Sequence, residues 1–147
     1  MAIEREATAT WEGSLARGTG RLASGSSSAF ADLAFSLPTR IGEPGAETSP
    51  EELLAAAHAG CYAMALASVL TNAEVPPGRL AVRCRIALTE DAERGFRVAH
   101  ATLTVDADVD GVSRDALRAA MEAADATCPY SALLRDAGAD VSTEVAR

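Results

Sequence analysis

The feature that most constrains this chain is a run of apolar and small residues from Leu53 to about Leu70. The segment before it, Thr48-Ser49-Pro50-Glu51-Glu52, predicts a helix start. Ser49 is the expected N-cap, Pro50 takes the first helical position, and Glu52 completes a capping box. Because almost every face of this helix is apolar, we expect it to be buried, partly by a second subunit.

Short strands separated by glycines are predicted before this helix, the first over Ala7–Trp11 and the last over Ala34–Pro38. After it, alternating apolar and polar residues predict a hairpin, and helical spacing predicts two further helices. These later elements are strands over 80–88 and 96–105 with a turn over 91–95, helices over 113–126 and 129–136, and a strand over 141–145. The order β-β-β-α-β-β-α-α-β predicts an α+β fold in a single domain, residues 1–147.

Charge and cysteine content exclude several classes of protein. The net charge of −8 argues against binding to nucleic acid or to an anionic membrane surface. All 13 cationic side chains are arginine, which excludes Schiff-base chemistry and a lysine-dependent phosphate loop. No segment reaches the ~18–20 uninterrupted apolar residues of a membrane span. Three widely spaced cysteines argue against a disulfide framework. The N-terminus is too acidic for a signal peptide. We therefore expect a cytoplasmic protein.

The three cysteines differ in their surroundings. Cys84 shares the apolar phase of its strand and is expected to be a small core residue. Cys61 lies within the apolar helix, where the residue types alone favour a core cysteine over a reactive one. Cys128 precedes Pro129 near a helix N-terminus, where an exposed thiol would be held as thiolate. Local context leaves open whether Cys128 is a redox group or a structural cap.

Two motifs in order carry a family resemblance. Ser49-Pro50-Glu51-Glu52-Leu53-Leu54-Ala55-Ala56-Ala57-His58-Ala59-Gly60-Cys61 is similar to the signature of the osmotically inducible protein C and organic hydroperoxide resistance (OsmC/Ohr) family. Cys128-Pro129-Tyr130-Ser131 resembles that family's second cysteine motif, and Trp11-Glu12-Gly13 and Pro38-Thr39-Arg40 resemble its OsmC branch. The likeness runs from about Ala7 to Ala146. It implies antiparallel sheets wrapped around a long buried central helix, in an intertwined homodimer.

The resemblance also implies a function, a thiol-dependent peroxidase that reduces organic hydroperoxides and, more weakly, hydrogen peroxide. By position, Cys61 corresponds to the peroxidatic cysteine and Cys128 to the resolving one. Arg40 corresponds to the arginine that supports the thiolate, and Glu51 to the acid that orients it. Arg17 and Arg21 are the alternative arginines, from the region that serves the Ohr branch. No cofactor or metal is implied, and the resemblance implies that an external dithiol of lipoyl type reduces the disulfide.

Physical chemistry is consistent with these roles. Desolvation raises the pKa of a cysteine in an apolar helix. A nearby arginine, which is always charged, lowers that pKa again by stabilising the thiolate. An apolar pocket around Cys61 would favour fatty or aromatic hydroperoxides. Glu51 and Cys61 lie ten residues apart, ~15 Å along one unbroken helix. Glu51 would therefore reach a Cys61 site only from the other subunit, if two such helices pack antiparallel.

Two other hypotheses remain. One is a non-catalytic dimer of the same fold that binds an apolar small molecule at the subunit interface. The other is a zinc protein that uses His58, Cys61 and Cys128, whose ligand types fit although their spacing does not support it. His58 is otherwise expected to be a packed or interface histidine.

Overall fold

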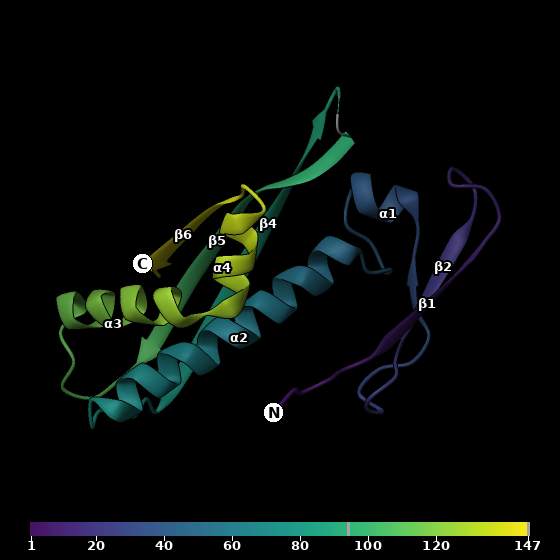
Figure 1. Cartoon of the computed structure of the whole chain (residues 1–147). Coiled ribbons are helices and arrows are strands. Elements are labelled where there is room, and N and C mark those ends of the chain that lie inside the picture. The colour runs from purple at the N-terminus through teal and green to yellow at the C-terminus, as the bar shows by residue number, and fades with distance from the viewer. Residues whose placement is uncertain (94, 147) are drawn as a thin grey trace. The chain divides into compact units, whose positions relative to one another are not determined.

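The computed structural model describes residues 1–93 and 95–146, so residue 94 of the predicted 91–95 turn lies outside the described residues. The chain divides into two compact units, Met1–Leu53 and Leu54–Arg147, and each is described by itself (Figure 1). The expectation that residues 1–147 act as one domain stays a prediction.

The first unit contains a three-stranded antiparallel sheet in the order β1 (Ala7–Glu12), β2 (Thr19–Ser24), β3 (Leu33–Phe35). Glycine is needed at Gly20, because a Cβ there would lie 2.2 Å from the Phe35 ring. That ring packs against Trp11, with the two ring centres 5.6 Å apart. Gly20 is nevertheless the sole buried residue among residues 1–53, all of which are described. This unit therefore has no hydrophobic core of its own.

The strand predicted over Ala34–Pro38 is wrong in its second half. β3 ends at Phe35, and a short helix, α1 (Leu37–Ile41), follows. Ser36 starts this helix with a reciprocal capping box: its hydroxyl accepts from the Thr39 N–H, and the Thr39 hydroxyl accepts from the Ser36 N–H at 2.9 Å. These paired side-chain bonds satisfy backbone donors at the helix start, so they favour a turn over continued strand.

The long helix α2 (Pro50–Asn72) is confirmed, and so is its start, where the Ser49 hydroxyl accepts from the Glu52 N–H at 3.1 Å. It is not buried on every side. Its buried residues recur every fourth position, at His58, Tyr62, Leu66 and Leu70, and so form one face. α2 is long and apolar enough to cross a membrane, but the core helices of soluble proteins meet the same criterion. In its most apolar stretch of 18 residues, 22% is buried.

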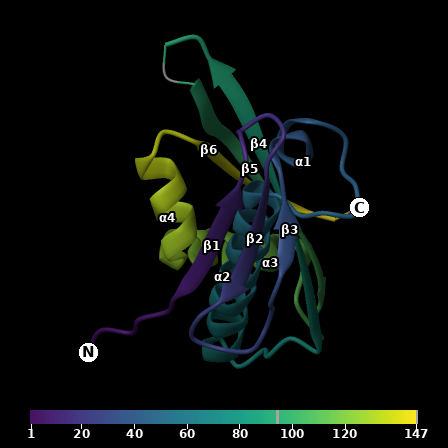
Figure 2. The ribbon, with the colours of Figure 1, turned by 90° about the vertical axis from the view of Figure 1, so that its right-hand side faces the viewer.

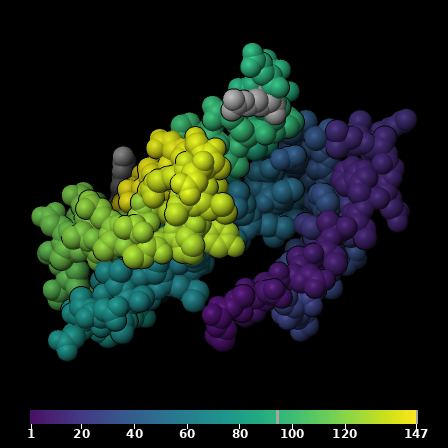
Figure 3. Space-filling model, viewed as in Figure 1, coloured from purple at the N-terminus to yellow at the C-terminus, as the bar shows by residue number. Residues whose placement is uncertain are grey.

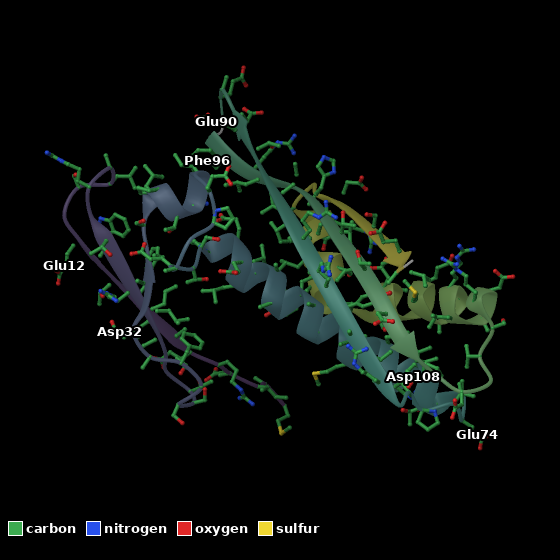
Figure 4. All side chains as sticks on the ribbon, turned by 180° about the vertical axis from the view of Figure 1, so that it is seen from behind. Glu12, Asp32, Glu74, Glu90, Phe96 and Asp108 are labelled. Atoms are coloured by element: carbon green, nitrogen blue, oxygen red, sulfur yellow. The ribbon has the colours of Figure 1, made fainter. Side chains whose placement is uncertain are left out.

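The second unit contains a sheet in the order β4 (Arg79–Asp91), β5 (Gly95–Asp108), β6 (Asp140–Val145). β4 and β5 form the predicted antiparallel hairpin, and Figure 4 shows Glu90 and Phe96 at one end of it and Asp108 at the other. The expectation of antiparallel sheets does not hold for β6, which pairs parallel to β5. Two helices connect these strands and return the chain to the same end of the sheet, as a parallel pairing requires.

These helices are α3 (Arg114–Thr127) and α4 (Pro129–Asp136), close to the predicted 113–126 and 129–136. Figures 1 and 4 show, from opposite sides, that α2, α3 and α4 lie on the same face of the sheet. In Figure 3 the green and yellow atoms of α3 and α4 pack closely against the teal atoms of α2. Beyond His100 the hairpin lacks the β6 strand, and Figure 2 shows that end projecting past α4.

The core of the second unit joins α2 to this sheet and to α3. Its buried members are Tyr62, Leu66, Leu70, Leu103, Val105, Leu117, Met121, Ala124 and Cys128. Alternate β5 residues point into it, and the intervening ones face the other side of the sheet. Cys84 packs against this core as a partly buried residue, as its strand phase predicts.

Substitution of Leu103, which is fully buried, tests this core. We expect Leu103→Ala to lower the free energy of unfolding by about 2–5 kcal/mol, because a cavity is added to the lost burial. Leu133→Ala, at a side chain 58% exposed on α4, is the control and should change it by less than about 0.5 kcal/mol. Urea denaturation measures both, and equal effects would contradict the assigned core.

Candidate active site

Two cysteines far apart in the sequence meet in the second unit. Cys61 lies in the middle of α2 and is half-buried, and Cys128 is the residue between α3 and α4, 1% exposed. Both are free thiols, and Cys128 Sγ donates a hydrogen bond to Cys61 Sγ at 3.6 Å. Small side-chain movements would bring this pair within disulfide distance, since a disulfide is about 2.05 Å long.

The Cys128-Pro129 sequence explains how this thiol reaches α2. The backbone of Cys128 is extended, with φ −76° and ψ 113°, as expected for a residue that precedes proline. Cys128 therefore ends α3 and caps α4 at once, and the bend leaves its side chain inside the core. Cys128 is therefore not the exposed thiol considered as one alternative, because the helix start that it caps faces the core.

Burial dominates the electrostatics of Cys61. It raises the pKa of the Cys61 thiol, and the neighbouring Cys128 thiol acts in the same direction. A hydrogen bond from the Tyr130 backbone in the first turn of α4 opposes both and favours the thiolate. This site disfavours the thiolate that nucleophilic chemistry needs, so further stabilisation would have to come from a cation.

The first unit brings together the two other predicted residues. Arg40, in the last turn of α1, donates from Nε and Nη2 to the same Glu51 oxygen, Oε1, at 3.0 and 2.9 Å. The Glu51 side chain is 15% exposed, and its Oε2 atom is buried with no hydrogen-bond partner among the described residues. The predicted pairing of this acid with Arg40 is therefore present. Arg21, an alternative arginine, pairs instead with Asp32 at 3.5 Å.

Sequence reasoning missed two contacts of His58. This fully buried histidine lies one turn before Cys61, and its Nε2 is 2.9 Å from the hydroxyl of Ser131 on α4. Its Nδ1 is 3.6 Å from Cys84 Sγ on β4. Ser131 follows Cys128 by three residues, and His58 precedes Cys61 by three. This matched spacing is the sequence signal from which the His58–Ser131 contact could have been predicted. The expectation of a packed histidine is confirmed.

The zinc hypothesis finds no support in this geometry. Among residues 1–93 and 95–146, no three His, Cys, Asp or Glu side chains are arranged to hold a metal ion. A hollow of about 620 Å³ in the second unit lies away from the two thiols, and Arg79, Arg83, Asp106 and Glu144 are among its lining residues. The apolar pocket expected around Cys61 stays a prediction.

Comparisons with known proteins find relatives that match almost the whole chain. The chain is 32% identical over 136 residues to the protein named Peroxiredoxin OsmC of Escherichia coli, and the alignment covers 92% of each chain. The crystal structure of the organic hydroperoxide resistance protein OhrB of Bacillus subtilis matches with a TM-score of 0.74 and 26% identity, covering 96% of this chain and 98% of that one. An OsmC structure from Legionella pneumophila shares the fold, with a TM-score of 0.76, 23% identity and full coverage of both chains.

The family comparison covers both motifs. The model of the family described as OsmC-like protein matches residues 42–144, which include Glu51, Cys61 and Cys128. The architecture is the α+β fold of the OsmC and Ohr structures. On this match and on the identity to the Escherichia coli relative, the chain belongs to the OsmC-like protein family.

Proposed function

We propose that this protein is a thiol-dependent peroxidase that reduces organic hydroperoxides and, more weakly, hydrogen peroxide. The observation that carries the proposal is the pair of free thiols, Cys61 and Cys128, with sulfurs 3.6 Å apart. Relatives named for peroxiredoxin activity and for organic hydroperoxide resistance support a peroxidase-type enzyme. We propose that the reaction needs neither a metal nor an organic cofactor.

In the proposed reaction the Cys61 thiolate attacks one oxygen of the hydroperoxide. The O–O bond breaks, the alcohol leaves with a proton, and Cys61 becomes a sulfenic acid. Cys128 sulfur then attacks Cys61 sulfur: the S–S bond forms, the S–O bond breaks, and the hydroxyl leaves as water with the Cys128 proton. An external dithiol, of lipoyl type in this proposal, then reduces the disulfide by exchange. We propose that the cycle runs in the cytoplasm.

We propose that Arg40 provides the cation that the Cys61 thiolate needs, with Glu51 as the residue that orients it. The two hydrogen bonds to a largely buried carboxylate support an oriented guanidinium. Because α2 runs unbroken from Pro50 to Asn72, Glu51 and Cys61 lie ~15 Å apart along it. We therefore propose that the Arg40–Glu51 pair of one subunit serves Cys61 of a second.

This arrangement requires an intertwined homodimer, and two features support it. The exposed face of α2 carries small residues and Met64, whose side chain is 76% exposed. Gly60 lies on that face, with open space where a Cβ would lie. Nothing within the described chain therefore requires glycine at this position. Glycine nevertheless destabilises a helix by about 1 kcal/mol relative to alanine. The first unit, moreover, lacks a core of its own. A second copy packed on these surfaces accounts for both.

The central test is the mass and free-thiol count of the protein after one equivalent of cumene hydroperoxide. The wild type should lose two thiols and ~2 Da. Cys61→Ser should consume no peroxide, and Cys128→Ser should gain ~16 Da as a sulfenic acid. Cys84→Ser is the matched control and should behave as the wild type.

Other outcomes would contradict parts of this mechanism. A wild-type product of +16 Da without a disulfide would keep Cys61 as nucleophile and remove Cys128 as its resolving partner. Unconsumed peroxide, with all thiols intact, would overturn the enzyme proposal and favour a dimer that binds an apolar small molecule at its interface.

The pH dependence of peroxide consumption tests the role of Arg40. Because burial raises the pKa of the Cys61 thiol, the thiolate fraction and the rate should increase with pH. Removing a nearby cation raises that pKa further, so Arg40→Ala should move the rate profile to higher pH and lower the rate at pH 7 by about tenfold or more. Arg21→Ala is the matched control. An unchanged profile in Arg40→Ala would remove Arg40 from the site.

Sedimentation equilibrium tests the homodimer. The wild type should have twice the chain mass of 15.1 kDa. Gly60→Glu should weaken the dimer by at least about tenfold, because it buries an unpaired charge in the proposed interface. Ala119→Glu, at an exposed position of α3, is the control and should stay dimeric. A monomeric wild type would contradict the shared site.

A further inference from the structure

Beside the two thiols lies a second polar contact that the proposed reaction does not use. His58 on α2 and Ser131 on α4 are both fully buried, and the histidine Nε2 lies 2.9 Å from the serine hydroxyl. Buried hydrogen-bonded groups are costly to leave unpaired, so this contact resists separation of the two helices. Burial also lowers the pKa of His58, so the imidazole is neutral at pH 7 and the contact carries no net charge.

The positions of these residues repeat the spacing of the cysteines. His58 precedes Cys61 by three residues on α2, and Ser131 follows Cys128 by three on α4. Residues three apart lie on neighbouring turns of one helix face. Among the described residues, the bonds between two side chains of these segments are Cys61–Cys128 and His58–Ser131, one turn apart, and the Tyr130 backbone also bonds the Cys61 thiol. The second contact thus holds the start of α4 in register beside Cys61.

Apart from the Tyr130 backbone bond to Cys61, the other restraints on this region act elsewhere. Arg135 at the far end of α4 pairs with Asp125 of α3, and the Tyr62 hydroxyl donates to the Met121 carbonyl oxygen of α3 at 2.9 Å. The remaining bond of His58, to Cys84 Sγ, joins α2 to β4 rather than to α4. His58–Ser131 is accordingly the contact best placed to control the gap between the two sulfurs.

We propose that His58 and Ser131 are positioning residues that keep Cys128 within reach of Cys61. This inference rests on the proposed function. It concerns which of two reactions the Cys61 sulfenic acid undergoes. In one fate, Cys128 sulfur displaces the hydroxyl, and water leaves as the disulfide forms. In the other, a second hydroperoxide transfers an oxygen to the sulfenic sulfur, its O–O bond breaks, and a sulfinic acid and an alcohol result. Reactions between groups held in place are sensitive to shifts of an ångström or less.

The first experiment measures the Cys61–Cys128 disulfide at equilibrium in buffers of reduced and oxidised dithiothreitol, without peroxide. Ser131→Ala removes the contact and loosens the dithiol state, while the oxidised state stays joined by its covalent bond. We expect the ratio of disulfide to dithiol to fall about tenfold, equivalent to ~30 mV. His58→Gln retains an amide that can reach Ser131, and it should recover most of the wild-type ratio.

Cys84→Ala is the matched control, because it removes the other hydrogen bond of the same histidine and leaves the α2–α4 contact intact. We expect its ratio to equal that of the wild type. An equal shift in Cys84→Ala and Ser131→Ala would show that general loosening is responsible and would overturn the proposal. A wild-type ratio in Ser131→Ala would also overturn it.

The second experiment follows each protein at rising concentrations of cumene hydroperoxide by intact mass. In Ser131→Ala the first turnover should still consume peroxide, because Cys61 is retained. The sulfinic product, ~32 Da above the dithiol, should appear at about tenfold lower peroxide concentration. A wild type that forms the disulfide in dithiothreitol buffers but consumes no peroxide would overturn the proposed function. In that case the inference about the two thiols is still decided by the first experiment.

Discussion

The packing of one face of α2 against β5 and α3 is the interaction on which the second unit depends. Tyr62, Leu66 and Leu70 enter the core from that face, and Leu103 and Val105 meet them from the sheet. His58 continues the same face toward the helix start, where its hydrogen bonds reach α4 and β4. Cys61 lies between these two anchored turns, so its position follows from the same packing that stabilises the unit.

This packing has a chemical cost. Burial raises the pKa of the Cys61 thiol and raises that of Cys84 to about 11, so the same environment keeps both sulfurs protonated. What distinguishes Cys61 is its additional contacts: a backbone hydrogen bond from Tyr130 and the thiol of Cys128. For Cys84, burial is the cause that raises the pKa, and its neighbour is the His58 ring. The reactivity proposed for Cys61 therefore depends on the groups around its sulfur and not on burial itself.

Local signals predicted the elements whose causes are local. The start of α2 follows from Ser49 and Pro50, and the β4–β5 hairpin follows from strict alternation. α1 was missed because its capping box uses Thr39 rather than the usual acid. The parallel pairing of β6 and the burial of Cys128 depend on how distant segments pack, as does the His58–Ser131 contact, which joins residues 73 apart. The Cys61–Cys128 pairing was reached by family resemblance, since spacing alone left both roles open.

The first unit buries a single glycine, and this has a consequence for how the molecule behaves on dilution. An isolated sheet of three short strands without a core is marginal in water. A ligand or chain that binds these apolar side chains stabilises the ordered sheet by its binding free energy. The ordered fraction therefore depends on the concentration of that partner. With a second copy of the chain as that partner, as proposed, residues 1–53 should be the first to exchange amide hydrogens as the protein concentration falls, well before the core around Leu103 opens.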